Sequence, residues 1–142
     1  MVVNTDLWLK CLNGEVEQVR EALDSGADPN STDVTGNLTL LMAAVFYNRE
    51  EVVDLLLATD GIEVNKRGNH STSLHTACVH DRGAIIIKLL AAPGIDANAL
   101  DTDNHTPIMW ALDRGATEAV RLMAPVADLD RKFPDGQSLE ER

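Results

Sequence analysis

Aromatic, cysteine and basic residues are all scarce in this sequence. Phe, Trp and Tyr make up 4% of the 142 residues, so a core must be built from Leu, Ile, Val and Ala. The two cysteines, Cys11 and Cys78, are too few for a disulfide scaffold. The 12 Lys and Arg residues face 23 Asp and Glu, a net charge of −11. That balance argues against nucleic-acid binding and is compatible with a basic partner.

Long apolar segments are also missing. The longest ones, such as residues 84–87 and 89–93, are far too short to cross a bilayer. Residues 1–10 contain neither a basic segment nor a long apolar stretch, so no secretory signal is visible. We therefore expect no membrane association and a cytoplasmic protein with reduced thiols, the nucleus being the alternative location.

The rest of the composition is that of a folded domain, and an internal repeat is its clearest feature. With 44% hydrophobic and 25% charged residues, the chain is predicted to form a single domain over residues 1–142. Segments anchored on Thr5, Thr39, Thr72 and Thr106 recur in steps of 34, 33 and 34 residues. Nine positions after each anchor comes a residue that favours turns: Gly14, Asn48, Asp81 and Gly115.

Each repeat is predicted to hold two helices and a hairpin-like turn. The anchor Thr should cap the first helix. The second helices are predicted over residues 16–23, 51–57, 85–90 and 118–123. Gly26, Gly61 and Gly94 should end the first three of these in the left-handed conformation. Asp60 and Pro93 are extra residues before the glycine, which predicts a slightly bulged helix end. Tight turns are expected at residues 33–36, 67–69, 101–104 and 134–136.

The motifs resemble the ankyrin repeat, whose helix start reads T-P-L-H-x-A on a period of about 33 residues. The matching segments are TSLHTA at 72–77, TPIMWA at 106–111 and the loop GADPN at 26–30. The resemblance covers residues 5–140. It implies an all-α ankyrin-repeat solenoid of stacked helix-turn-helix units joined by β-hairpin-like loops. The repeats would span about 5–38, 39–71, 72–105 and 106–138, followed by a short C-terminal stub that is either a natural cap or part of a longer array. Trp8 and Lys10 depart from the motif, as expected of a solvated N-terminal cap.

The resemblance also implies that a partner binds the concave face, formed by the hairpin tips and the exposed side of the first helices. Phe46 and Tyr47 are the strongest candidates, because aromatic residues are frequent in binding hot spots. Packing of Phe46 into the core is the alternative. Trp110 either lines the same face or packs inside, and we expect it to pack inside. The positively charged candidates are either partner contacts or solvated charges. Besides these three residues, the candidate set contains Leu12, Asn13, Val79, His80, Asp113 and Arg114 on the helices, and Lys66, Arg67 and His105 on the hairpin side.

Catalytic and metal-binding motifs are not found. His75, Cys78 and His80 lie close together but lack the spacing of a zinc site. His75 occupies the histidine position of the repeat, which implies a bond to backbone, and Cys78 falls in an apolar column. No nucleophile, phosphate-binding or metalloprotease motif appears. We therefore expect no enzyme activity, no metal and no cofactor.

The predicted function is a non-catalytic protein–protein interaction module, an adaptor or inhibitor, that is a monomer on its own. The alternative role is as a substrate. Asn65 and Asn98 look like asparagines that an oxygen-dependent asparaginyl hydroxylase modifies in ankyrin loops, with Leu eight positions before and an acid two before. Asn30 has Ala22 instead of that leucine. These asparagines are also expected to hold the loops by side-chain-to-backbone bonds.

Overall fold

The computed structural model describes residues 5–141, apart from the side chain of Thr5. Within this range eight α-helices follow one another in four pairs, and a short 3-10 helix, η1 (Leu139–Glu141), comes last. The helices are α1 (Thr5–Asn13), α2 (Val16–Asp24), α3 (Leu40–Phe46), α4 (Glu50–Leu57), α5 (Ser73–Val79), α6 (Gly83–Leu90), α7 (Pro107–Arg114) and α8 (Thr117–Met123).

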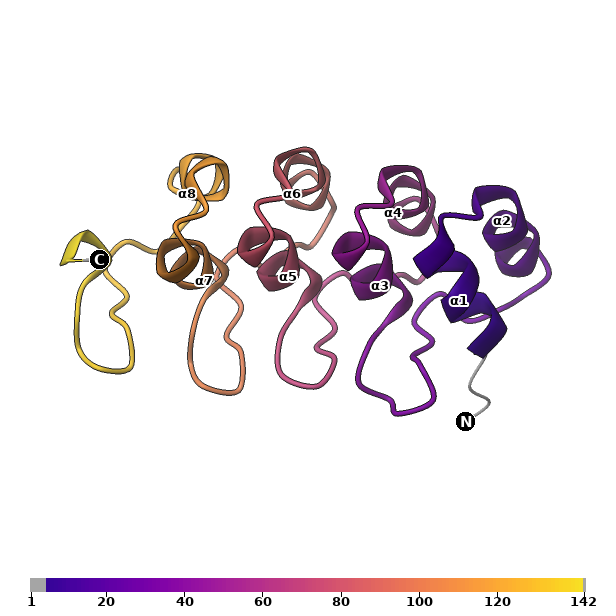
Figure 1. Ribbon diagram of the computed structural model, residues 1–142, viewed down its shortest axis with the longest axis horizontal. Coiled ribbons are helices and arrows are strands. Elements are labelled where there is room, and N and C mark those ends of the chain that lie inside the picture. Colours follow the sequence, from indigo (N-terminus) through magenta and orange to yellow (C-terminus); the bar gives the residue numbers. More distant parts are fainter. Residues whose placement is uncertain (1–4, 142) are drawn as a thin grey trace.

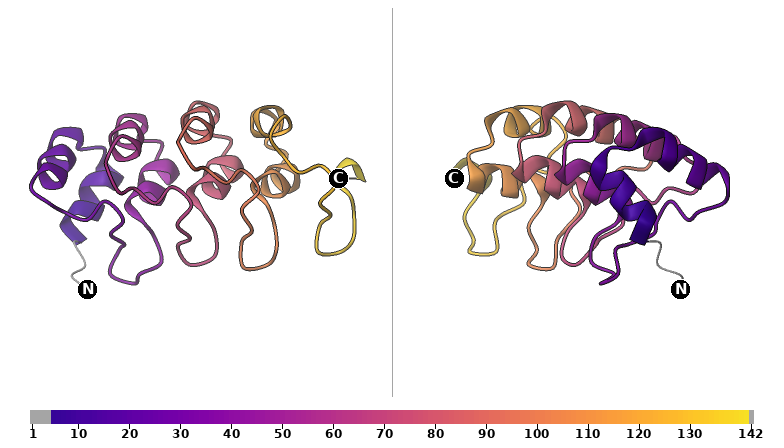
Figure 2. Two further views of the ribbon diagram at one scale, coloured as in Figure 1. Left: turned by 180° about the vertical axis from the view of Figure 1, so that it is seen from behind. Right: turned by 45° about the vertical axis from the view of Figure 1, so that its right-hand side comes forward.

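The helix pairs stack into a solenoid, as the repeat predicts. Figure 1 shows three rows: an outer row of α2, α4, α6 and α8, an inner row of α1, α3, α5 and α7, and the hairpins below them. Each helix packs against the same helix of the next repeat, α3 on α5 and α4 on α6 for example. Turning the molecule shows all hairpins projecting to the same side of the inner helices (Figure 2). This surface of inner helices and hairpins is the concave face.

The anchor threonines act largely as predicted. The hydroxyl of Thr39 accepts from the amide of Met42 at 3.1 Å, and Thr72 accepts from His75 at 3.4 Å. At Thr106 the amide of Met109 donates to the main-chain carbonyl, and Pro107 begins α7 where a helix tolerates proline. The side chain of Thr5, predicted to cap the first helix, lies outside the described residues. The turn residues nine positions after the anchors all adopt positive φ, from 54° at Asp81 to 74° at Gly14.

The ends of α4 and α6 differ from the prediction that Gly61 and Gly94 end them, whereas Gly26 follows the C-cap of α2 at positive φ, as predicted. Gly61 does not end α4, because the helix stops at Leu57 and Ala58 caps it. The hydroxyl of Thr59 donates to the carbonyl of Leu55 at 2.8 Å. This bond satisfies one of the main-chain carbonyls at the end of α4 that have no partner within the helix. The extra residue, Asp60, therefore lies in the following turn, as Pro93 does after α6. The predicted helix bulge is wrong. The starts of α4, α6 and α8 also lie one or two residues earlier than predicted, because their first turns contain polar or small residues that apolar spacing cannot detect.

Adjacent hairpins are joined by main-chain bonds. The amide of Asn69 donates to the carbonyl of Asn37 at 2.7 Å, and the amide of Thr102 donates to the carbonyl of His70 at 3.0 Å. Gly68 lies at this contact, and a Cβ there would collide with the carbonyl oxygen of Asn37. Glycine is needed at this position for the close approach of two backbones. The final hairpin, residues 131–138, leads into η1, and its Phe133 is buried.

The core runs through all repeats and is closed by their contacts. The apolar residues two positions after the anchors are all buried, and Cys11, Val45 and Cys78 line a second buried column. His75 is fully buried, and its Nε2 donates to the carbonyl of His105 at 2.9 Å across the repeat boundary. Since a carbonyl can only accept, Nε2 carries the proton and Nδ1 faces the hydroxyl of Thr72 at 2.8 Å. The predicted bond from His75 to backbone is confirmed.

No helix among residues 5–141 combines the length and the apolar character needed to span a bilayer.

Candidate functional site

Equivalent positions of successive inner helices bring most of the predicted site residues to one face. The candidates seven and eight positions after the anchors lie where each inner helix ends. Leu12 and Val79 are half-buried. The exposed ones are Asn13, Phe46, Tyr47, His80, Asp113 and Arg114.

Phe46 and Tyr47 form an exposed aromatic pair at the end of α3. Phe46 is 48% exposed and Tyr47 44% exposed. Their ring centroids lie 5.0 Å apart, and the ring of His80 meets Phe46 edge-on at 4.8 Å. Core packing of Phe46, the alternative, is wrong because Leu41 and Val45 already fill the interior side of α3. The main-chain carbonyl of Phe46 accepts from Nη2 of Arg82 at 3.0 Å, which ties this end of α3 to the next repeat.

An apolar hollow of about 200 Å³ adjoins this pair, and we call it the aromatic hollow. Of its lining residues, only Phe46 and Tyr47 were predicted from the sequence. The positions of most of the others within the repeat could have indicated them. Four of them, Trp8, Met42, Ala43 and Thr76, stand three or four positions after an anchor threonine, on the same side of their helices. Leu38 comes from the hairpin and is itself exposed. The hollow is lined by Trp8, Leu38, Met42, Ala43, Phe46, Tyr47 and Thr76.

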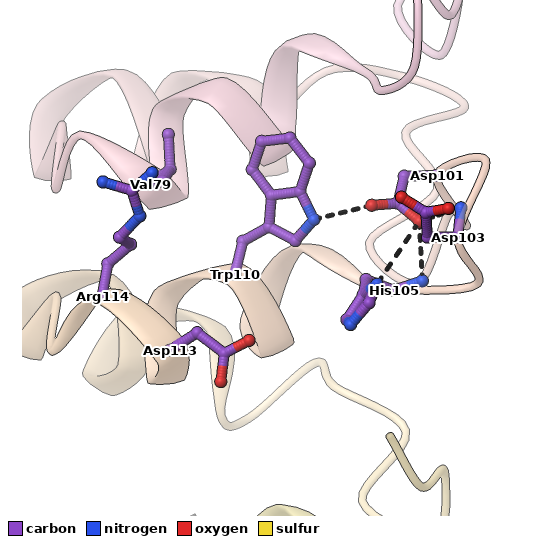
Figure 3. A pocket seen from close by; sticks show the side chains of 7 residues that line it. All are labelled: Val79, Asp101, Asp103, His105, Trp110, Asp113 and Arg114. Carbon is purple, nitrogen blue, oxygen red and sulfur yellow. Dashed lines mark hydrogen bonds and ion pairs between the residues drawn. The ribbon is translucent and has the colours of Figure 1, made fainter. Parts of the chain in front are cut away.

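A second hollow, of about 270 Å³, lies at the other end of the face between α5, α7 and the hairpin of residues 101–105. We call it the acidic hollow. Trp110 forms its centre (Figure 3) and is half-buried, with the ring of His75 5.1 Å away. The expectation that Trp110 packs inside holds only for part of the ring. The residues that line the hollow are Val79, Asp101, Asp103, His105, Trp110, Asp113 and Arg114.

Asp101 organises the acidic hollow, and sequence reasoning treated it only as a turn residue. Its Oδ2 accepts from the indole Nε1 of Trp110 at 2.8 Å. Its Oδ1 accepts from the amides of Asp103 at 2.8 Å and His105 at 2.7 Å (Figure 3). Burial by itself would raise the pKa of Asp101, but these bonds outweigh burial and lower its pKa. The carboxylate is thus charged and fixed, and it holds the hairpin against α7.

The charge environment at the centre of the face is different. Burial lowers the pKa of His80, and the nearby guanidinium groups of Arg82 and Arg114 lower it further. His80 is therefore neutral at neutral pH next to Phe46, and the guanidinium of Arg82 is the charged group at the end of α3. Of the two hollows, the one at the α7 end contains the carboxylates.

Lys66 and Arg67 do not join the other candidates. Nζ of Lys66 donates to the main-chain carbonyl of Asn30 at 3.0 Å and lies 4.0 Å from Glu63. It lines a separate open hollow with Asn65 and Gly94, and Arg67 is exposed but lines neither of the two hollows described above. The lysine thus fastens a loop between repeats.

The loop asparagines bridge repeats with both ends of their side-chain amides. Asn65 donates to the carbonyl of Gly94 at 2.8 Å and accepts from the amide of Asp96 at 2.8 Å. Asn98 donates to Val126 at 3.2 Å and accepts from Asp128 at 2.8 Å. The predicted loop-holding role is confirmed, and it applies to Asn30 as well.

The described residues hold no group of three or more His, Cys, Asp and Glu suited to a metal ion. Cys11 and Cys78 are free and buried, and burial raises the pKa of each thiol to about 12. Both remain protonated at neutral pH, so neither thiol is activated as a nucleophile.

Comparison with known proteins agrees with this architecture. A family model of ankyrin repeats, three copies, matches residues 7–101. The chain is 34% identical over 114 residues to a putative ankyrin repeat protein of fowlpox virus, FPV031, covering 77% of the chain and 32% of that protein. It is 30% identical over 130 residues to the ankyrin repeat protein nuc-2 of Neurospora crassa, covering 89% of the chain and 12% of that protein.

A third relative carries a different name. The Drosophila melanogaster E3 ubiquitin-protein ligase Ufd4 is 38% identical over 99 residues, covering 69% of the chain and 4% of that protein. In these three relatives the match spans a third of the protein's length or less. The matched family model and the stacked helix pairs lead to one conclusion: the chain belongs to the ankyrin-repeat family.

Proposed function

We propose that this chain is a non-catalytic module that binds another protein through its concave face and acts as an adaptor or an inhibitor. The observation that carries the proposal is the exposed pair of Phe46 and Tyr47 at the aromatic hollow. Ankyrin repeats in general mediate protein–protein interaction, and this pair supplies a specific anchor on the face.

The energetics favour binding at this pair. Two aromatic rings that are nearly half exposed leave a large apolar surface in contact with water. Aromatic residues at the centre of an interface contribute more than most other residues when they become buried. Phe46 ends α3, Tyr47 caps this helix and the two rings contact each other before binding, which lowers the entropic cost of association.

The test is a pull-down from cell extract with the wild-type chain and a Phe46→Ala/Tyr47→Ala variant, with bound proteins identified by mass spectrometry. The matched control is Ile87→Ala, which removes a side chain that is 55% exposed on the outer helix α6. Loss of a partner from the double variant, with retention by the control, supports the proposal. Equal retention by all three proteins contradicts the assignment of the face, provided that circular dichroism shows the double variant to be folded.

Adaptor and inhibitor roles differ in what happens to the partner. An inhibitor lowers the activity of the purified partner when added in stoichiometric amount, whereas an adaptor leaves that activity unchanged and bridges a second protein. We also propose a monomer in solution and a cytoplasmic location, with the nucleus as the alternative. Light scattering after gel filtration measures the mass against 15.4 kDa, and imaging of a tagged chain tests the location.

A second proposal is that Asn65 and Asn98 are substrates of an asparaginyl hydroxylase. Asn65 is exposed, and its position relative to Leu57 and Glu63 is the observation that favours it. Incubation with such an enzyme should add one oxygen atom to the intact mass, and Asn65→Ala should remove one modified site. The side-chain amide of Asn65 is bonded to the neighbouring loop and must be released before an enzyme can bind it. We therefore expect modification to proceed faster in destabilised variants, in which this loop opens more often. An unchanged mass would end this proposal.

A further inference from the structure

The aromatic and acidic hollows occupy the same register position of the repeat. Ala43, Phe46 and Tyr47 follow the anchor Thr39 by four, seven and eight positions. The same offsets from Thr106 give Trp110, Asp113 and Arg114, which line the acidic hollow. The two hollows therefore lie on the same face, centred on α3 and on α7, and α5 contributes Thr76 to the first and Val79 to the second.

The two hollows differ in chemistry. Apolar side chains line the first one, apart from Thr76 and the hydroxyl of Tyr47. The second has three carboxylates, Asp101, Asp103 and Asp113, against the single guanidinium of Arg114. In Figure 3, Trp110 separates Arg114 from Asp101 and Asp103. An aromatic ring next to carboxylates favours a cation, through the π-face of the ring and through the charges.

We infer that the occupant of this face is an extended partner segment with two anchors: an apolar side chain in the aromatic hollow and a Lys or Arg side chain in the acidic hollow. This inference rests on the proposed function and adds the chemistry of the partner. The net charge of −11 attracts a basic segment, and the local excess of carboxylates places its cation at the α7 end.

Helix packing gives the spacing between the two anchors. The inner helices α3, α5 and α7 pack side by side, and neighbouring helix axes in proteins lie about 8–10 Å apart. The two steps from α3 over α5 to α7 therefore correspond to about 16–20 Å between the axes of α3 and α7. An extended chain advances about 3.3 Å per residue, so the apolar and basic residues stand about five or six positions apart. A helical segment, which rises about 1.5 Å per residue, would need about twelve.

The test uses fluorescein-labelled peptides of Gly and Ser that carry one Leu and one Arg, in both orders, with the separation varied from about two to about twelve residues. Binding to the wild-type chain is followed by fluorescence anisotropy at low salt. We expect the tightest binding at a separation of about five or six. Replacing the peptide's Arg by Gln should lower the affinity at this separation about tenfold, or by ~1.4 kcal/mol. An optimum near twelve, no optimum, or no binding above a Gly-Ser peptide overturns the inference.

Two chain variants assign the cation to its hollow. The variant Asp103→Asn/Asp113→Asn should weaken binding of the Arg peptide about tenfold. Binding of the Gln peptide should be unchanged, because the lost interaction needs both the carboxylates and the peptide's Arg. The matched control, Glu50→Gln/Glu51→Gln on the outer helix α4, removes the same charge and should have a much smaller effect. Equal weakening by both variants means attraction by net charge alone, which overturns the assignment to the acidic hollow.

The partner found by pull-down separates this inference from the proposed function. If Phe46→Ala/Tyr47→Ala abolishes binding and Asp103→Asn/Asp113→Asn does not affect it, the binding module stands and the two-anchor inference fails. If the aromatic variant leaves binding intact, the proposed function itself fails at this face.

Discussion

The side chain of Asn65 donates from Nδ2 to the main-chain carbonyl of Gly94 at 2.8 Å, so one repeat holds the loop of the next. Asn30 and Asn98 repeat this contact one unit before and one unit after. A single residue type at a fixed position thus ties all four loops together outside the apolar core. The loops stay in register because each asparagine amide satisfies a carbonyl and an amide that the turn leaves unpaired.

Asn65→Ala should destabilise the fold by about 1–3 kcal/mol, because it removes two hydrogen bonds across the repeat boundary. Urea denaturation followed by circular dichroism measures the change. The control is Asn13→Ala at the exposed end of α1, where we expect less than about 0.5 kcal/mol. Equal effects of the two changes would show that the bridge contributes nothing to stability.

Leu56→Ala should cost about 2–5 kcal/mol, since Leu56 is fully buried between repeats and its loss leaves a cavity. Leu129→Ala, at a side chain that is 61% exposed, is the matched change and should cost little. Both are measured by the same urea denaturation. A loss well under about 1 kcal/mol for Leu56→Ala would contradict the packing described for α4.

Trp110→Phe should raise the pKa of Asp101, because it removes one of the bonds that lower this pKa. A lowered folded pKa stabilises the protein above the ordinary value of about 3.9, and that stability is lost as the pH falls through the lowered value. The variant should therefore be less stable than wild type by about 1–3 kcal/mol at pH ~7, and the difference should shrink below pH ~4.

An NMR titration of the Asp101 carboxyl in both proteins measures this change directly. His80→Ala is a suitable control, since His80 lies on the same face and makes no bond to Asp101. It should leave the pKa of Asp101 near its wild-type value. The same pKa in wild type and Trp110→Phe would mean that the indole does not hold the carboxylate.

Cys11 and Cys78 should resist thiol reagents in the folded state. Burial blocks access and raises the pKa of each thiol to about 12, so little thiolate exists at pH ~8. Labelling with a chromogenic disulfide should follow the rate of unfolding and reach two thiols per chain in urea. Above pH ~9 the unfolded chain ionises its thiols first, so alkaline pH should lower stability. Fast labelling of the native protein would contradict the burial of both cysteines.

Much of the fold could be predicted from the repeat. The anchors, the turn residues and the buried columns obey local rules, since helix periodicity, caps and positive φ depend on residues a few positions apart. The ends of α4 and α6 could not be predicted, because Thr59 closes α4 with a side-chain bond that apolar spacing does not reveal. Helix ends of this kind are hard to predict, because side-chain hydrogen bonds compete there with the main-chain bonds of the helix.

The candidate site was predicted in part. Phe46 and Tyr47 stand out in a chain with few aromatic residues, and their position in the repeat indicates exposure. The roles of Lys66 and Asp101 could not be predicted in the same way. Each depends on one contact to a residue of another element, Asn30 for the lysine and Trp110 for the carboxylate.

The family, the number of helix pairs in the described chain and the buried side of each helix can all be read from the amino-acid sequence. These follow from a pattern that repeats along the chain. The positions of the two hollows and the side chains that line them depend instead on how the repeats pack against one another. Trp8, Phe46 and Thr76 come from three different repeats, and they meet because stacking brings equivalent positions of neighbouring helices together. A hollow depends on the sizes of side chains facing one another across repeats, and no single repeat contains that information.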